Sequence, residues 1–202
     1  MATTQSSGGK STKKSASSAS KSSASKAKST SRAKSASASK KTTTRRPATP
    51  EAIALLKADH REVEKLFSQF EKAKDDDQKL QLAQRICLEL KVHTQIEEEI
   101  VYPTSREFLD DEDIVDEAVV EHQAAKDLIA EIEGMKPGDD LYDAKVKVLS
   151  EQVEHHVEEE EKEYFPKLQK SDMDLKAIGE QLKMRKQELM GQMEAEAPLR
   201  TQ

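Results

Sequence analysis

Apolar residues recur every three or four positions through most of the chain after residue 50, which is the spacing of one buried helix face. This pattern predicts an all-α fold. The five predicted helices span residues 50–73, 77–102, 111–133, 140–169 and 172–193. Thr49 as N-cap and Pro50 in the first turn predict the start of the first helix. Gly134 and the pair Pro137–Gly138 predict the stop and the turn after the third helix.

Two further expectations concern a helix end and the outermost helix. Pro103 should end or kink the second helix, because proline lacks the N–H that the helical hydrogen bond needs. Ser171 should cap the fifth helix, which we expect to pack on the outside of the other four. Its apolar face comprises Leu175, Ile178, Leu182 and Leu189, and that of the third helix comprises Val115, Val119, Ala125 and Ile129.

Four of the chain's five histidines interrupt these apolar faces, one in each of the first four helices. They are His60, His93, His122 and His156. Glu97 and Glu160 lie on the same faces, each four residues after a histidine. The fifth histidine, His155, has glutamates at the corresponding helical positions, so we expect it to face solvent.

The motif of the second helix returns in the fourth helix at an offset of 63 residues. This offset aligns His93 with His156, Glu97 with Glu160, Tyr102 with Phe165 and Pro103 with Pro166. The first and third helices match likewise, as Asp59-His60 and Glu121-His122. The sequence therefore contains two helix pairs, each of which supplies one histidine and then a His-x-x-x-Glu pair.

A single histidine on an apolar face is more often a core residue than a metal ligand, and a lone His-x-x-x-Glu pair is common on helices. The six residues together change this comparison, because four imidazoles and two carboxylates are costly to bury without a cation. We therefore predict a divalent-metal site. Imidazole and carboxylate ligands suit iron, and also manganese or zinc.

Other polar residues near these motifs have less specific interpretations. Asp59 and Glu121 either support the predicted ligands or are simple surface charges. We expect the remaining glutamates beside the motifs to form a solvated acidic face. These are Glu98, Glu99, Glu158, Glu159 and Glu161. Cys87 is interpreted as a small core residue.

Charge divides the chain into two parts. Residues 1–50 hold 12 Lys and Arg and no Asp or Glu, whereas the remainder carries a net charge of −18. The basic segment consists almost entirely of Ser, Ala, Lys and Thr, so we expect residues 1–49 to form a disordered tail. Its composition resembles the tails of linker histones and of some bacterial nucleoid-associated proteins. Such a polycation binds nucleic acid through phosphate; alternatively, it solubilises the chain or pairs with the acidic part.

Composition also bears on the compartment. No apolar run approaches the length that crosses a membrane, and the N-terminal residues lack the apolar segment of a secretory signal. The single cysteine excludes an intramolecular disulfide and fits a reducing compartment. We expect a cytoplasmic protein, associated with the nucleoid if the tail binds DNA.

The motifs together resemble one known family. They are Leu55-Leu56-Lys57-Ala58-Asp59-His60, His93-x-x-x-Glu97 with Tyr102-Pro103, Glu121-His122, and His156-x-x-x-Glu160 with Phe165-Pro166. Over about residues 51–170, they are similar to the hemerythrin-like, HHE cation-binding family. The resemblance implies an up-down four-helix bundle around a non-haem di-iron site. It further implies that the four histidines are terminal ligands and that Glu97 and Glu160 are bridging carboxylates.

Composition, helical periodicity and this resemblance together suggest three segments: a basic tail (1–49), a hemerythrin-like bundle (50–170) and a C-terminal helix packed on it (171–202). The sequence departs from the oxygen-carrying members, which have a further histidine where this chain has Lys126. The site is therefore expected to be more open, unless Glu64 supplies an extra ligand.

The open site leaves two functions in consideration. The favoured one is a binding protein that binds or senses dioxygen or a related oxidant such as peroxide, or that holds iron. The alternative is a di-iron oxidase or peroxidase that protects against peroxide stress. That enzyme needs a proton donor, and Tyr102 and Tyr164 are candidates, although packing is the favoured role for both.

Overall fold

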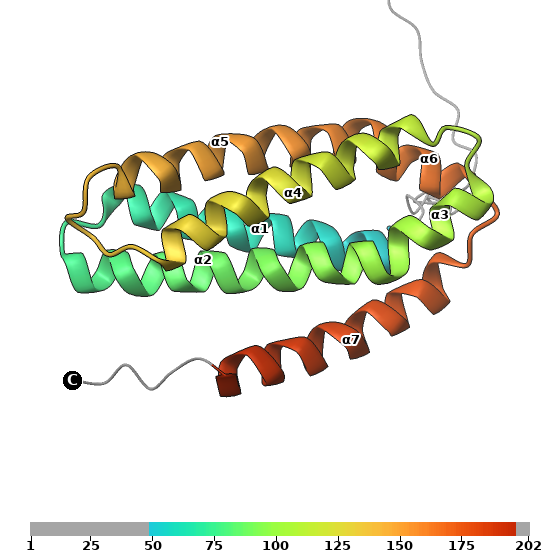
Figure 1. The fold of residues 1–202 in the computed structure, drawn as a ribbon. Coiled ribbons are helices and arrows are strands. Elements are labelled where there is room, and N and C mark those ends of the chain that lie inside the picture. The colour runs from blue at the N-terminus through green and yellow to red at the C-terminus, as the bar shows by residue number, and fades with distance from the viewer. Residues whose placement is uncertain (1–48, 197–202) are drawn as a thin grey trace, which may run out of the picture. The chain divides into compact units, whose positions relative to one another are not determined.

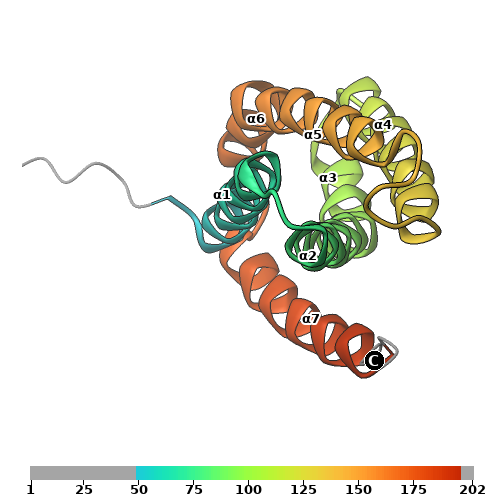
Figure 2. The ribbon, with the colours of Figure 1, turned by 90° about the vertical axis from the view of Figure 1, so that its left-hand side faces the viewer.

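Four antiparallel helices surround a common axis, and a further helix lies outside them (Figure 1). The computed structural model describes residues 49–196. The four bundle helices are α1 (Glu51–Lys72), α2 (Asp76–Ile96), α4 (Asp113–Glu133) and α5 (Tyr142–Glu159). Viewed along the axis, they follow one another around a ring in the order α1, α2, α4, α5 (Figure 2). The all-α prediction is confirmed.

The second and fourth predicted helices each contain a wider turn. α2 continues through the π-helix η1 (Glu97–Val101) into α3 (Tyr102–Phe108). α5 continues in the same way through the π-helix η2 (Glu160–Tyr164) into α6 (Phe165–Lys170). Both π-helices begin at a glutamate of the predicted metal site. π-turns are rare and occur frequently at functional sites.

The π-turns explain why the two prolines do not end their helices. The backbone N–H of Tyr102 donates to the carbonyl of Glu97, five residues earlier, and Phe165 donates likewise to Glu160. Pro103 follows this widened turn directly and occupies the beginning of α3. Of the two expected effects of Pro103, the helix end does not occur, because the altered hydrogen-bond register accommodates a residue without an N–H.

Apolar side chains form two clusters along the bundle. One contains Ile53, Leu56, Ile96 and Phe165, with further residues from α7. The other contains Val63, Phe67, Ile86, Leu90 and Leu149. In α1 and α2 the site histidines lie in the chain between residues of the first cluster and residues of the second. The polar site is thus a layer enclosed between two apolar ones.

The outer helix α7 (Leu175–Glu196) packs on α1 and α2 (Figures 1 and 2). All four residues predicted for its apolar face are buried. Gly179 allows the close approach, because a Cβ there would lie 2.7 Å from the backbone nitrogen of Ala52. Asp174, rather than Ser171, accepts a hydrogen bond from the first turn, at 3.0 Å from the nitrogen of Ala177. Ser171 is instead the C-cap residue of α6.

Two other local predictions were wrong. The N-cap of α1 is Pro50 rather than Thr49, and no side chain caps this helix. Val119 is 40% exposed, because Ala118 takes the inward position of α4 between Val115 and His122. The turn at Gly138 was predicted correctly, and its φ of 90° is a conformation that glycine adopts without strain.

No helix among residues 49–196 is long and apolar enough to cross a membrane. The predicted basic tail lies outside the described residues, except for Thr49.

Candidate metal centre

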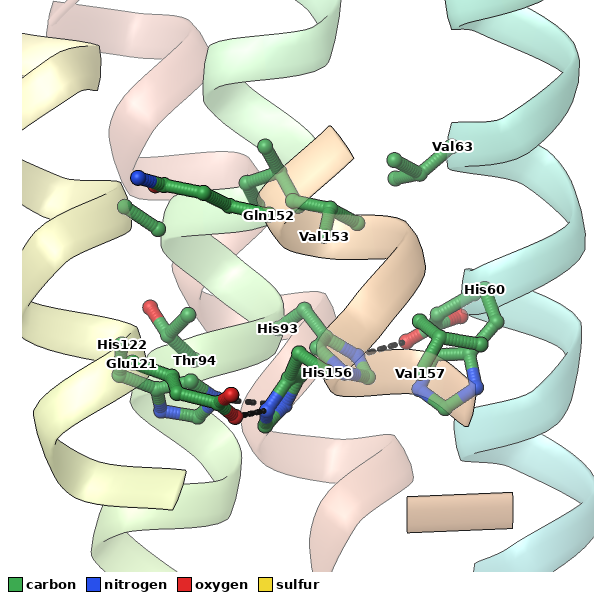
Figure 3. A pocket seen from close by; sticks show the side chains of 13 residues that line it. His60, Val63, His93, Thr94, Glu121, His122, Gln152, Val153, His156 and Val157 are labelled. Carbon is green, nitrogen blue, oxygen red and sulfur yellow. Dashed lines mark hydrogen bonds and ion pairs between the residues drawn. The ribbon is translucent and has the colours of Figure 1, made fainter. Parts of the chain in front are cut away.

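The six predicted ligands converge on one buried point inside the bundle. Figure 3 shows the four histidines, one from each bundle helix, turned toward a common space. Glu97 and Glu160 enter the same space from the first residue of each π-helix. The six side chains belong to the small set of buried polar residues. The sequence prediction thus named residues that the fold brings together.

Each glutamate lies between two histidines. Glu97 Oε2 is 3.2 Å from His93 Nε2 and 3.5 Å from His122 Nε2. Glu160 Oε2 is 3.2 Å from His60 Nε2 and 3.7 Å from His156 Nε2. The two halves of the centre therefore repeat each other, as the 63-residue sequence offset predicts.

Several inward-facing atoms of the centre are buried without a hydrogen-bond partner. They are His60 Nε2, His93 Nε2, both carboxylate oxygens of Glu97, and Glu160 Oε2. Unsatisfied buried polar atoms are rare in folded proteins, because each costs the free energy of its lost hydration. Ligand atoms that converge on one another without forming hydrogen bonds fit metal cations, and the imidazole–carboxylate set fits iron, manganese or zinc.

The donor atoms form two groups that share one residue. His60, His93, Glu97 and Glu160 place ligand atoms within 4.8 Å of one another. Glu97, His122 and His156 do the same. A carboxylate common to both groups can bridge two cations, so the residues fit a centre of two metal ions.

Two histidines are held by glutamates that the sequence analysis assigned to a solvated face. His60 Nδ1 is 3.0 Å from Glu161 Oε1, and His122 Nδ1 is 3.1 Å from Glu98 Oε1. Because an ionised carboxylate only accepts hydrogen bonds, Nδ1 carries the proton and Nε2 keeps its lone pair for the centre. The missed signal was the repeated Glu-Glu pair, in which each supporting glutamate directly follows an inner one.

The other two histidines are held by the carboxylates that precede a ligand. His156 Nδ1 is 2.7 Å from Glu121 Oε2 (Figure 3), and His93 Nδ1 is 3.5 Å from Asp59 Oδ2. Of the two interpretations considered for Asp59 and Glu121, the structure supports the ligand-supporting one. Carboxylates that orient the outer nitrogen of a ligating histidine are usual at metal sites.

The charges of the centre shift the pKa values of its members. Burial disfavours the charged form of His93, but Glu97 and Asp59 outweigh burial and raise the pKa of His93. Burial likewise raises the pKa of Glu97, and the adjacent His93 overcomes this and holds it below the usual range. Without a metal the centre therefore retains protons on imidazole. A cation that binds there must displace them.

Tyr102 extends its hydroxyl into the centre, although the sequence favoured a packing role. Its oxygen is 3.2 Å from His122 Nε2 and 3.5 Å from Glu160 Oε1. Burial, together with the charges of Glu97 and Glu160, raises the pKa of the phenol well above its usual range, so the hydroxyl keeps its proton. The repeat-related residue is Phe165, which stacks on His60. The centre is therefore chemically asymmetric.

Four other residues considered in the sequence analysis lie away from the centre. Glu64 is exposed and pairs with Arg61, so it is not an additional ligand. Lys126 occupies the position of the additional histidine in oxygen carriers, and its Nζ lies 2.5 Å from Glu98 Oε2. His155 is exposed, as predicted. Tyr164 donates to Ser105 Oγ at 2.8 Å rather than to the centre.

A cavity of about 30 Å³ adjoins the histidines. Its other walls are mostly apolar, and its lining includes Val63, Leu90, Ala125, Val153 and Val157. A volume of this size holds about one or two atoms of water size. The centre therefore has room beside it for a small molecule.

The sequence model of the Hemerythrin HHE cation binding domain matches residues 51–168, which is more than half of the chain. The chain belongs to this family. The match covers the four bundle helices and ends before α7. The hemerythrin-like chain is thus a cation-binding bundle with an additional helix packed on it.

Two relatives of known sequence are similar to part of this chain. An uncharacterized hemerythrin-like protein of Schizosaccharomyces pombe is 27% identical over 114 residues, which cover 55% of this chain and 56% of that protein. A DNA nickase of Nostoc is 28% identical over 111 residues, 55% of this chain and 31% of the nickase. The matches thus span about half and about a third of these curated relatives.

The fold is also found in a solved structure. A crystal structure of a hemerythrin HHE cation binding domain-containing protein from Mycobacterium kansasii is similar with a TM-score of 0.61 at 19% identity. The similarity covers 74% of this chain and 93% of that one, and it supports the bundle fold.

Proposed function

We propose that this protein holds two non-haem iron ions and uses them to bind or sense dioxygen or a related oxidant, or to hold iron. The shared position of Glu97 between two groups of buried ligand atoms carries this proposal, because it fits a pair of ions rather than one. Iron is chosen over manganese and zinc because the resemblance to the hemerythrin-like family implies a di-iron site. The ligand set alone suits all three metals.

In this proposal the residues have distinct tasks. The four histidines would offer Nε2 as terminal ligands, and Glu97 and Glu160 would act as the bridging carboxylates that the family resemblance implies. Of the two glutamates, Glu97 belongs to both groups of ligand atoms. The supporting carboxylates fix the histidine tautomers. Iron, when bound, supplies reversible electron transfer to an oxidant. The apolar cavity admits a small molecule and excludes bulk water from the centre.

An oxidase or peroxidase that removes peroxide is the second candidate. The hydroxyl of Tyr102 favours it, because this protonated phenol lies 3.2 Å from His122 Nε2 and can donate a proton or a hydrogen bond inside the centre. Tyr102→Phe removes this donor and leaves the metal ligands intact. Loss of peroxide turnover with unchanged metal content would favour the enzyme.

The metal content and the absorption spectrum of the full chain test the proposed function. The metal-free protein is loaded with ferrous iron without air, and oxygen is then admitted and removed. We expect about two irons per chain and a band that appears with oxygen. A reversible band indicates binding or sensing, whereas a single irreversible oxidation indicates storage or peroxide chemistry.

The assignment of ligands is tested by a double substitution. His93→Ala with His156→Ala removes one terminal ligand from each group and should abolish stoichiometric metal binding. His155→Ala is the matched control. This neighbouring histidine is exposed, so its substitution should leave two irons bound. Two tightly bound irons in the double variant would contradict the site.

We further propose that the basic segment at residues 1–49 tethers the bundle to nucleic acid. Its 12 Lys and Arg without any Asp or Glu support this, because such a segment binds phosphates by releasing counterions. The similarity of part of this chain to part of a DNA nickase is a second, more distant indication.

A further inference from the structure

One lysine of the outer helix contacts a carboxylate that supports the metal centre. Lys186 Nζ lies 2.6 Å from Asp59 Oδ1, and 3.6 Å from Glu89 Oε2. The side chains of Asp59 and Glu89 are only 10% and 8% exposed. Buried carboxylates need a charge partner, and Lys186 supplies one from outside the bundle.

The second oxygen of Asp59 faces the centre. Asp59 Oδ2 is 3.5 Å from His93 Nδ1, and His93 Nε2 is 3.2 Å from Glu97 Oε2. A continuous line of contacts therefore runs from Lys186 through Asp59 and His93 to the inner glutamate. The family match ends at residue 168, whereas α7 begins at Leu175, so this line starts outside the shared cation-binding domain.

Within residues 49–196, the other supporting carboxylates have their charge partners on the bundle helices. Glu98 pairs with Lys126 of α4, and Glu161 pairs with Lys57 and Arg61 of α1, so their cations belong to the bundle. Glu121, the repeat equivalent of Asp59, has the exposed His155 at 3.7 Å. Asp59 is thus the supporting carboxylate whose cation comes from α7.

We propose that Lys186 is a positioning residue through which the docking of α7 sets the affinity of the metal held by His93. This inference rests on the proposed function. Lys186 holds one oxygen of Asp59, so that the other oxygen is oriented to accept a hydrogen bond from Nδ1 of His93. Without this cation the Asp59 side chain is free to turn away, and His93 loses the partner that orients its ring.

The remaining contacts of α7 allow this lysine to be changed by itself. Leu182 and Leu189 are buried against the bundle, and Arg185 pairs with Glu99 in a two-point contact of 2.6 and 2.9 Å. Lys186→Met retains all of these contacts and most of the side-chain volume. We therefore expect the variant to fold with α7 in place.

The test measures two dissociation constants for zinc in the full chain, by competition with a chromophoric chelator. Lys186→Met should weaken one of the two about tenfold or more, which is the usual effect of losing such a supporting contact. Lys186→Arg keeps the charge and should retain most of the affinity. Lys183→Met is the matched control, because Lys183 is exposed on the same helix and should change neither constant.

A double-mutant cycle separates positioning from a general effect on packing. In an Asp59→Asn background, Lys186→Met should change the zinc dissociation constants little further, since Lys186 acts through Asp59. In the zinc-loaded protein, the Nδ1 proton resonance of His93 should move in Lys186→Met, while that of His156 stays. Equal constants in wild type and Lys186→Met, or additive losses in the cycle, would overturn the inference. Failure of the wild type to bind two ions would instead overturn the proposed function.

Discussion

Each site histidine contacts the centre through one ring nitrogen and a carboxylate of another helical segment through the other. One ring nitrogen faces the inner glutamates, and the other contacts a carboxylate that belongs to a neighbouring helical segment, as His60 does with Glu161 of η2. Since each outer carboxylate holds a histidine through Nδ1, the Nε2 atoms are directed inward before a metal binds. The ligand set is therefore preorganised by eight side chains in pairs, rather than by the histidines alone.

Glu161→Gln tests this pairing at the residue scale. The amide oxygen is a weaker acceptor than the carboxylate and cannot balance Lys57, so the His60 ring is less firmly oriented. We expect the affinity for one of the two metal ions to fall about tenfold or more. Chelator competition measures this change. Glu158→Gln, on the exposed side of the same helix, serves as the control, and an equal loss there would show that the effect is not specific.

At the scale of elements, the π-helices determine how two consecutive glutamates serve one site. In η1 and η2 the first glutamate faces the centre, and the second reaches the outer nitrogen of a histidine on another helix. The wider turn also accommodates Pro103. A single change of hydrogen-bond register thus explains both the ligand geometry and the continuation of the helix.

The contact between α7 and α1 depends on a glycine. A Cβ at Gly179 would lie 2.7 to 2.9 Å from Ala52 and Glu51, including backbone atoms of both. Gly179→Ala should therefore destabilise the fold by about 1–3 kcal/mol, in spite of the better helix propensity of alanine. A Cβ at Gly191 would have no neighbour within 4 Å, so Gly191→Ala should instead stabilise the helix by about 1 kcal/mol. Chemical denaturation measures both, and a stabilised Gly179→Ala would contradict the close approach.

At the scale of the whole molecule, charge is separated along the chain. The first 50 residues carry a net charge of +12, and the remainder carries −18. An acidic bundle is repelled by a phosphate backbone, so any attraction to nucleic acid must come from the basic segment. The metal centre and the basic segment are therefore expected to act independently.

Removal of residues 1–47 tests this independence. The shortened chain should lose its salt-dependent retention on DNA, because the counterion-releasing cations are absent. Its metal content should equal that of the full chain, since none of the candidate ligands is removed. Salt gradients on immobilised DNA and metal analysis provide the two measurements. Retention of the shortened chain at the same salt concentration would contradict the tether.

The sequence by itself determined the all-α class, the approximate bounds of the helices, and the six inner residues. It could do so because helical periodicity and the 63-residue repeat can be recognised in the sequence without knowing how the helices pack. The tertiary structure alone decided the partners across helices. Glu161 supports His60 from 101 residues away, and Lys186 reaches Asp59 from 127 residues away. Such contacts depend on helix packing and on the π-turn register, which no periodicity within one helix encodes.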